Sequence, residues 1–249
     1  MDLLLPTLTL FFTLLLSSTK SQENCTLAGD LVFVVDSSGS IGSTNFNLMR
    51  EFIVKVLENL NIGQDGTRVG FVSYSTSAVS RFFLNDDFVA SSVIARVRNV
   101  PYTGGGTNTS GGMRVMTNEQ FTSSRGDRAD VTNFGVVITD GNSNRDSHRL
   151  AADAQEAKNR GIICFAVGIT GSVNTNELMT ISSAPFLQGE TWWTNPDFVT
   201  VQQIAPQISN AICKQALPPI NGVRLPSHGS ITLILPIFLV AAASSLLKT

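Results

Sequence analysis

The stretch LVFVVDSSGSIG, residues 31–42, decides the fold that we predict for this chain. It opens with five consecutive apolar residues, which is typical of a β-strand buried on both faces. At Asp36 it becomes polar and glycine-rich, as expected where a strand ends in a loop. Three similar near-continuous apolar runs follow, at residues 69–74, 134–139 and 162–169.

Helical patterns lie between these runs. One face of the first predicted helix carries Phe46, Met49, Ile53, Val56, Leu57 and Leu60. A weaker pattern of the same kind runs through Leu150, Ala154 and Ala157 and ends at Gly161. Strands that alternate with helices predict an α/β fold: a doubly wound, mostly parallel central sheet with helices on both faces. Residues 78–84 follow the second strand too closely for a crossover helix, so we expect an antiparallel edge strand there.

Composition limits the classes of function. The 249 residues include 17 basic and 19 acidic side chains, for a net charge of -2. Because no basic block stands out, the chain offers no electrostatic surface for a nucleic acid. Residues 3–16 and 231–247, near the two ends, are almost wholly apolar and carry no charge. We expect a signal peptide at 1–21, a single folded domain at 22–217, a polar spacer at 218–230 and a hydrophobic tail at 231–249.

The hydrophobic tail predicts a membrane attachment. Its apolar run, 231–247, is shorter than the roughly 20 residues of a membrane helix, contains Pro236, and is followed by Lys248 as the only charged residue. These features favour a GPI-attachment signal, with Asn221 as the lipidation site. The alternative for the tail is a retained single-pass membrane helix. The alternative for the amino-terminal segment, 1–21, is an uncleaved membrane anchor.

The three cysteines predict one disulfide in an oxidising compartment. Cys25 precedes the first strand and Cys213 ends the last predicted helix, so we expect these two to pair. Such a bridge closes almost the whole domain, and the chain-entropy model gives it about 5 kcal/mol. Cys164 lies inside an apolar run and is interpreted as a small buried hydrophobe.

Oxygen-bearing residues gather in three loops, two directly after predicted strands and one in the turn before the third predicted helix. In an open parallel sheet, ligands bind at the carboxyl ends of the strands. The residues expected to meet there are Asp36, Ser38 and Ser40 after the first strand, Thr107 in the glycine-rich loop YTGGGTNTSGGM, and Asp140 in VVITDGNS. All are hard oxygen donors, with no Cys or His among them. This set suits Mg²⁺, or Mn²⁺ or Ca²⁺, and argues against zinc.

Taken together, these motifs resemble the metal-ion-dependent adhesion site of the von Willebrand factor type A (VWA) domain. That site consists of a DxSxS loop, a threonine in a glycine-rich loop and an aspartate in a T-D-G turn. The similarity extends from about Cys25 to Cys213 and includes AVGI and ISSAP. It therefore covers essentially the whole predicted domain.

The resemblance implies how a cation is bound. Ser38, Ser40 and Thr107 would coordinate it directly, while Asp36 and Asp140 would act largely through water. Because neutral hydroxyls leave much of the charge uncompensated, a vacant position would favour an Asp or Glu carboxylate brought by an extracellular protein. We therefore expect an adhesion or binding module and not an enzyme.

The chain is more similar to the VWA domains of matrilins and non-fibrillar collagens than to the inserted domains of integrins. Residues 168–174 lead straight into the next helix, with no room for the extra short helix of collagen-binding integrins. A solitary domain with an anchor favours a cell-surface receptor. The alternative is a secreted or matrix-associated protein that assembles with collagen-like or mineral matrix.

A metal-dependent hydrolase is the remaining alternative class. Of the two histidines, His228 lies in the spacer and His148 in a polar stretch near the predicted metal edge. His148 beside Ser143 resembles a base and a nucleophile. We interpret His148 as a solvent-exposed residue near a helix start.

Several short motifs are weaker indicators of function. Arg125-Gly126-Asp127 is the tripeptide that integrins bind, and we expect it to be a chance occurrence. Asn24 and Asn108 begin glycosylation sequons. We predict a glycan on Asn24 and none on Asn108, which adjoins Thr107. Trp192 and Trp193 are interpreted as packing residues.

Overall fold

The computed structural model describes residues 28–216, which contain one six-stranded sheet. The strand order is β3-β2-β1-β4-β5-β6. The strands are β1 (Gly29–Asp36), β2 (Thr67–Tyr74), β3 (Ala78–Phe82), β4 (Thr132–Thr139), β5 (Ile163–Ile169) and β6 (Trp192–Asn195). All neighbours are parallel except β2 and β3, which are antiparallel. The predicted doubly wound α/β fold and its antiparallel edge strand are therefore confirmed.

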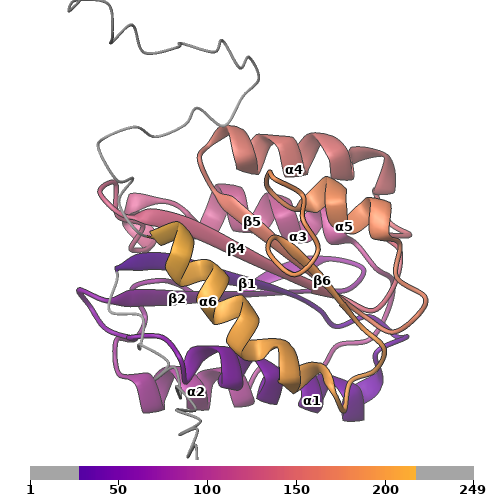
Figure 1. Cartoon of the computed structure of the whole chain (residues 1–249), viewed down its shortest axis with the longest axis horizontal. Coiled ribbons are helices and arrows are strands. Elements are labelled where there is room, and N and C mark those ends of the chain that lie inside the picture. The colour runs from indigo at the N-terminus through magenta and orange to yellow at the C-terminus, as the bar shows by residue number, and fades with distance from the viewer. Residues whose placement is uncertain (1–27, 217–249) are drawn as a thin grey trace, which may run out of the picture. The chain divides into compact units, whose positions relative to one another are not determined.

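Helices cover both faces of the sheet (Figure 1). The helices are α1 (Gly42–Leu57), α2 (Ala90–Arg98), α3 (Thr109–Val115), α4 (Leu150–Asn159), α5 (Thr175–Ile181) and α6 (Ala205–Ala216). Helices α1, α2 and α6 pack on one face, and α3, α4 and α5 on the other. A π-helical turn, Met116–Gln120, extends α3.

Strand β1 lies in the centre of the sheet and is buried along its whole length. Its alternating side chains serve two separate apolar cores. Leu31, Phe33 and Val35 face the core under α1, α2 and α6, whereas Val32 and Val34 face the core under α3, α4 and α5. Burial on both faces explains why the strand is a continuous apolar run in the sequence.

Two elements differ from the sequence-based expectations. Strand β6 is a sixth strand that no apolar run predicted, and it places the buried Trp192 and Trp193 at the edge of the sheet. The sequence suggested a last helix over roughly 197–213, but this helix begins at Ala205, after a 3₁₀ turn at Val201–Ile204, and ends at Ala216. The segment from Thr170 to Asn174 connects β5 to α5 without an inserted helix, as expected.

Several predictions concern residues outside the described range. These are the signal peptide (1–21), the spacer (218–230), the tail (231–249), Cys25, Asn24 and Asn221. Within the described part, Cys164 is a free, buried thiol and Cys213 is disulfide-bonded. The pairing of Cys213 with Cys25 stays a prediction. No helix among residues 28–216 is long and apolar enough to cross a membrane.

Candidate metal centre

Asp36 ends β1 and is completely buried. One carboxylate oxygen, Oδ1, accepts a hydrogen bond from the backbone N–H of Ser38 at 2.8 Å. The other, Oδ2, accepts from the hydroxyl of Thr139 at 2.9 Å. Thr139 is the last residue of β4, the strand that pairs with β1 in parallel, so the sheet register brings these two strand ends together.

A chain of oxygen atoms links the first loop to Asp140. The hydroxyls of Ser38 and Ser40 lie 3.1 Å apart, and the hydroxyl of Ser40 donates to Oδ1 of Asp140 at 2.9 Å. Ser38 is buried, whereas Ser40 is exposed. The site therefore has a buried floor and an open side.

The glycine-rich loop lies directly against the first loop. The N–H of Gly39 donates to the carbonyl of Gly105 at 2.9 Å, and the N–H of Gly104 donates to the carbonyl of Ser37 at 2.8 Å. Gly104 and Gly105 have φ values of +70° and +103°, a region that glycine enters without steric cost. This close backbone contact carries Thr107 to the same edge of the sheet.

The loop after β4 holds Thr107 with contacts that sequence reasoning missed. The side-chain oxygen of Asn144 accepts from the N–H of Thr107 at 2.9 Å. The carbonyl of Thr107 accepts from the hydroxyl of Ser143 and from the N–H groups of Asn144 and Arg145. Thr107 is only 5% exposed. Its position is thus set by the loop that also carries Asp140.

The buried carboxylates have no positive partner among residues 28–216. Neither Asp36 nor Asp140 takes part in an ion pair there. Burial raises the pKa of Asp36 to about 6, and the nearby Asp140 adds to this increase. Burial also raises the pKa of Asp140. Two buried acidic groups without a counter-charge are unfavourable, and a cation would relieve this.

The oxygen spacing fits a small octahedral cation. Ligands of Mg²⁺ lie 2.0–2.1 Å from the ion, so neighbouring ligand oxygens are about 2.9 Å apart. The separation of 3.1 Å between the Ser38 and Ser40 hydroxyls is close to this value, and the hydrogen bond of 2.9 Å from Ser40 to Asp140 places a carboxylate directly behind one of these hydroxyls. The side chains present therefore fit a divalent cation.

Carboxylate-rich metal clusters are absent from the described residues. No group of three or more His, Cys, Asp or Glu residues could hold an ion there. The site relies instead on hydroxyls, which rarely signal a metal by themselves. The three-loop pattern, and not residue chemistry alone, is what identifies it.

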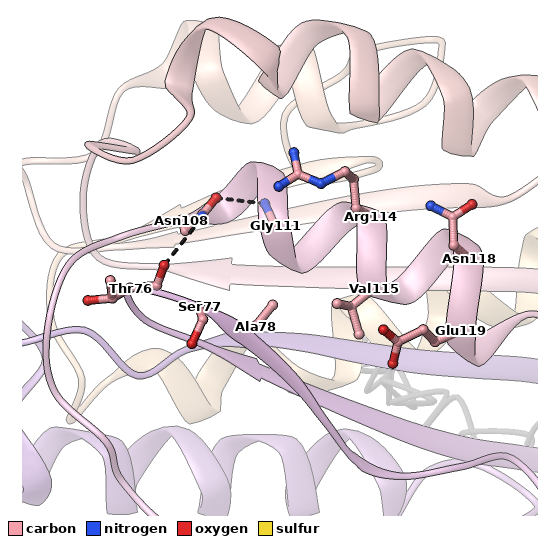
Figure 2. A pocket seen from close by; sticks show the side chains of 9 residues that line it. All are labelled: Thr76, Ser77, Ala78, Asn108, Gly111, Arg114, Val115, Asn118 and Glu119. Carbon is pink, nitrogen blue, oxygen red and sulfur yellow. Dashed lines mark hydrogen bonds between the residues drawn. The ribbon is translucent and has the colours of Figure 1, made fainter.

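A polar groove begins next to the metal centre. Its volume is about 420 Å³, and Thr76, Ser77, Asn108, Arg114 and Glu119 are among its lining residues. Figure 2 shows the groove between the β2–β3 turn and α3 with its π-helical extension. The side chain of Asn108 donates to the carbonyl of Thr76 and caps α3 by accepting from the N–H of Gly111.

These contacts bear on two predictions about single residues. Asn108 is buried and its amide is engaged, which supports the expected absence of a glycan there. His148 lies exposed in a 3₁₀ turn, while the hydroxyl of Ser143 donates to the carbonyls of Thr107 and Arg145. The hydroxyl of Ser143 thus serves the loop structure.

The tripeptide Arg125-Gly126-Asp127 packs against the rest of the domain. The guanidinium of Arg125 lies 4.0 Å from the centre of the Phe83 ring. Gly126 is buried, and its carbonyl accepts from Arg68 at 3.0 Å. These contacts hold the tripeptide in place, which argues against its presentation to an integrin as a flexible loop.

Comparisons with known proteins identify relatives of the whole described domain. The family model described as von Willebrand factor type A domain matches residues 30–207. Matrilin-1 of Homo sapiens is 34% identical over 191 residues, which is 77% of this chain and 37% of the relative. The collagen alpha-4(VI) chain of Mus musculus is 34% identical over 186 residues, 74% of this chain and 8% of the relative.

A solved structure shares the fold and bears on the site. Proximal thread matrix protein 1 of the mussel byssus, determined with a zinc-occupied MIDAS motif, has a TM-score of 0.69 and 24% identity. The match covers 76% of this chain and 47% of that one. In that protein, the ion in the adhesion-site motif is zinc.

Proposed function

The chain belongs to the von Willebrand factor type A domain family, and on that basis we propose that it binds an extracellular matrix protein through a divalent cation. The family relationship identifies a binding module of the matrilin and collagen type, which is not an enzyme. The chain spans about a third of the length of matrilin-1, so activities of the whole relative remain proposals here.

One observation carries the proposal. Asp36 and Asp140, both buried, adjoin the Ser38 and Ser40 hydroxyls, and neither carboxylate has an ion-pair partner in the described residues. Oxygen atoms at this spacing, with uncompensated negative charge, favour a small divalent cation. Ser38, Ser40 and Thr107 would hold the ion directly, and Asp36 and Asp140 would act through water. When bound, the ion supplies a Lewis-acidic position for an anionic oxygen.

A carboxylate of the partner suits that position. The groups that would bind the ion directly are neutral hydroxyls, so an open position on the ion would favour an anionic oxygen, and the exposed Ser40 lies on the open side of the site. The adjoining polar groove offers hydrogen-bonding groups to residues next to that carboxylate. The proposed partner is thus a matrix protein, collagen among them, that presents Asp or Glu.

The relatives favour a matrix role over the expected cell-surface role. Matrilin-1 and the collagen alpha-4(VI) chain are matrix proteins, and the mussel neighbour is a thread matrix protein. We therefore propose that the domain works in the extracellular matrix. Lipidation at Asn221, in a segment outside the described residues, remains the cell-surface alternative.

Ligand capture tests the cation bridge. Immobilised wild-type domain, offered extracellular-matrix extract, should retain partners in Mg²⁺ and lose them in EDTA. Asp140→Ala should retain none in either buffer while keeping the wild-type fold by circular dichroism. Equal retention in Mg²⁺ and EDTA would exclude a metal bridge. Repeating the capture with Mn²⁺, Ca²⁺ and Zn²⁺ identifies the ion that supports binding.

Enzymatic release tests the anchor. Phosphatidylinositol-specific phospholipase C on intact cells should release a GPI-linked protein, and the mature C-terminal peptide should then end at Asn221. If the protein is instead recovered from the matrix fraction without the enzyme, the matrix role holds. A retained peptide that contains Lys248 would establish the membrane-helix alternative.

A further inference from the structure

Helix α5 contributes a carboxylate to the neighbourhood of the metal centre. Glu177 lies in the first turn of α5 and is half-buried. Its position three residues after Asn174, the residue that caps the helix, matches the capping-box pattern, in which a glutamate turns back to its own helix start. The pattern alone predicts that the Glu177 carboxylate contacts only the start of its own helix, α5.

The carboxylate instead reaches the loop after β4. Both of its oxygens lie 3.1 Å from the backbone nitrogen of Ser143, which donates to them. Ser143 comes three residues after Asp140, and its hydroxyl donates to the carbonyl of Thr107 at 3.3 Å. One residue of this loop therefore connects Glu177 to Thr107.

The start of α3 lies beside the same carboxylate. Burial raises the pKa of Glu177, and the nearby hydroxyl of Thr109, two residues after Thr107, opposes that increase. Thr109 is completely buried, and its hydroxyl donates to that of Tyr74 at 3.5 Å. Through Ser143, Glu177 thus joins α5 to the two loops that carry Thr107 and Asp140, which lie 33 residues apart in the chain.

Glu177 has no ion-pair partner among the described residues. A half-buried carboxylate held by neutral donors has a desolvation cost that no opposite charge offsets. We propose that Glu177 is a positioning residue of the cation site, which holds Ser143 so that Thr107 and Asp140 keep their mutual placement. The proposal rests on the proposed function.

Two substitutions of Glu177 separate its geometry from its charge. Glu177→Ala removes the contact with Ser143, and we expect the Kd for Mg²⁺, measured by calorimetry, to rise by about 10–100-fold, the usual effect of losing a group that orients a metal ligand. Glu177→Gln keeps a carbonyl oxygen that can accept from Ser143, so its Kd should lie between wild type and Glu177→Ala.

The matched control loosens the other end of the same helix. Lys158 of α4 donates to the carbonyls of Thr180 and Ser182 at the carboxyl end of α5. Lys158→Ala should lower the melting temperature in EDTA but leave the Kd for Mg²⁺ within about twofold of wild type. If Glu177→Ala behaves like Lys158→Ala, with a lower melting temperature and an unchanged Kd, the positioning role is overturned.

Hydrogen exchange in EDTA provides a readout that needs no cation. Glu177→Ala should speed exchange of the Ser143 amide in the metal-free protein, and Lys158→Ala should not. Unchanged exchange at Ser143 would overturn the positioning role even if the wild type binds Mg²⁺. Absence of cation binding by wild type, with faster exchange in Glu177→Ala, would instead overturn the proposed function and leave Glu177 as a loop tether only.

Discussion

The two ends of β1 each carry a buried aspartate, but their surroundings differ. At the amino end, Asp30 receives three hydrogen bonds from Arg128: from Nε at 2.9 Å, from Nη2 at 2.7 Å and from the backbone N–H at 2.7 Å. At the carboxyl end, the donors to Asp36 within the described part of the chain are neutral: the backbone N–H of Ser38 and the hydroxyl of Thr139. Burial raises the pKa of both carboxyls, and at Asp30 the contacts with Arg128 oppose that increase.

Because of this difference, we assign a structural role to the end of β1 at Asp30 (the structural end) and a functional role to the end at Asp36. Arg128 also donates to the carbonyls of Gly29 and Gly66, so it completes the hydrogen bonding at the amino end of the strand. Among residues 28–216, no positive side chain pairs with Asp36 at the other end, where Asp140 adds a second carboxylate. The charge that Arg128 supplies at one end is the charge that we expect a divalent cation to supply at the other.

The largest expected effect is at the structural end. Arg128→Ala leaves Asp30 buried with the backbone N–H of residue 128 but without a positive partner, and we expect a loss of about 3–5 kcal/mol in the free energy of unfolding, measured with urea. The loss should be the same in EDTA and in Mg²⁺. A loss below about 1 kcal/mol would show that Asp30 needs no positive partner and would remove the contrast between the two ends.

Asp140→Asn should have the opposite pattern. Removing one of two neighbouring buried carboxylates relieves desolvation and repulsion, so the free energy of unfolding in EDTA should stay the same or rise slightly. The Kd for Mg²⁺ should rise by about 100-fold, the upper end of the effect of losing a group that acts on the metal through another ligand. Marked destabilisation in EDTA with unchanged Mg²⁺ binding would assign Asp140 to the structure.

Addition and removal of metal should act on one end alone. Mg²⁺ at 100 times its Kd should stabilise the wild type by about 2.7 kcal/mol, and EDTA should reverse this. Arg128→Ala should gain the same increment, because six residues of strand separate the two ends by about 20 Å and distant sites behave additively. Asp140→Asn should gain little at that concentration. A smaller gain for Arg128→Ala than for wild type would show that the ends are coupled.

The smallest expected effect concerns Arg125-Gly126-Asp127, which immediately precedes Arg128 and belongs to the structural end. The side chain of Asn133 donates to Asp127 at 2.8 Å. Asp127→Glu should leave cell attachment to the immobilised domain unchanged, since the tripeptide is held by the fold. A large loss of attachment would give the structural end a binding role.

The sequence predicted the main features of the sheet because buried strands are long apolar runs. Strand β6 escaped prediction because its four residues, Trp192–Asn195, are too few for a recognisable pattern. The DxSxS and T-D-G motifs placed Asp36 and Asp140 at one edge because strands β1 and β4 are parallel neighbours.

The contacts that support the site and the amino end of β1 have no comparable pattern in the sequence. Asn144 and Ser143 lie in an ordinary polar loop, and their roles depend on the tertiary approach of Thr107. Glu177 fits a helix-capping pattern that conceals its contact with another loop. The pairing of Asp30 with Arg128 joins residues 98 apart, a separation for which one sequence contains no pattern.

The most direct test of the central claim is the position of a bound ion. Crystals of the domain grown with Mn²⁺ and measured for anomalous scattering should show one strong peak within about 2.3 Å of the hydroxyl oxygens of Ser38, Ser40 and Thr107, allowing for slightly longer bonds than those of Mg²⁺. Asp140→Asn crystals should show a weak peak or none there. If the wild-type density lacks a peak at these hydroxyls, or places it at Asp30, the end of β1 at Asp36 is not a cation site.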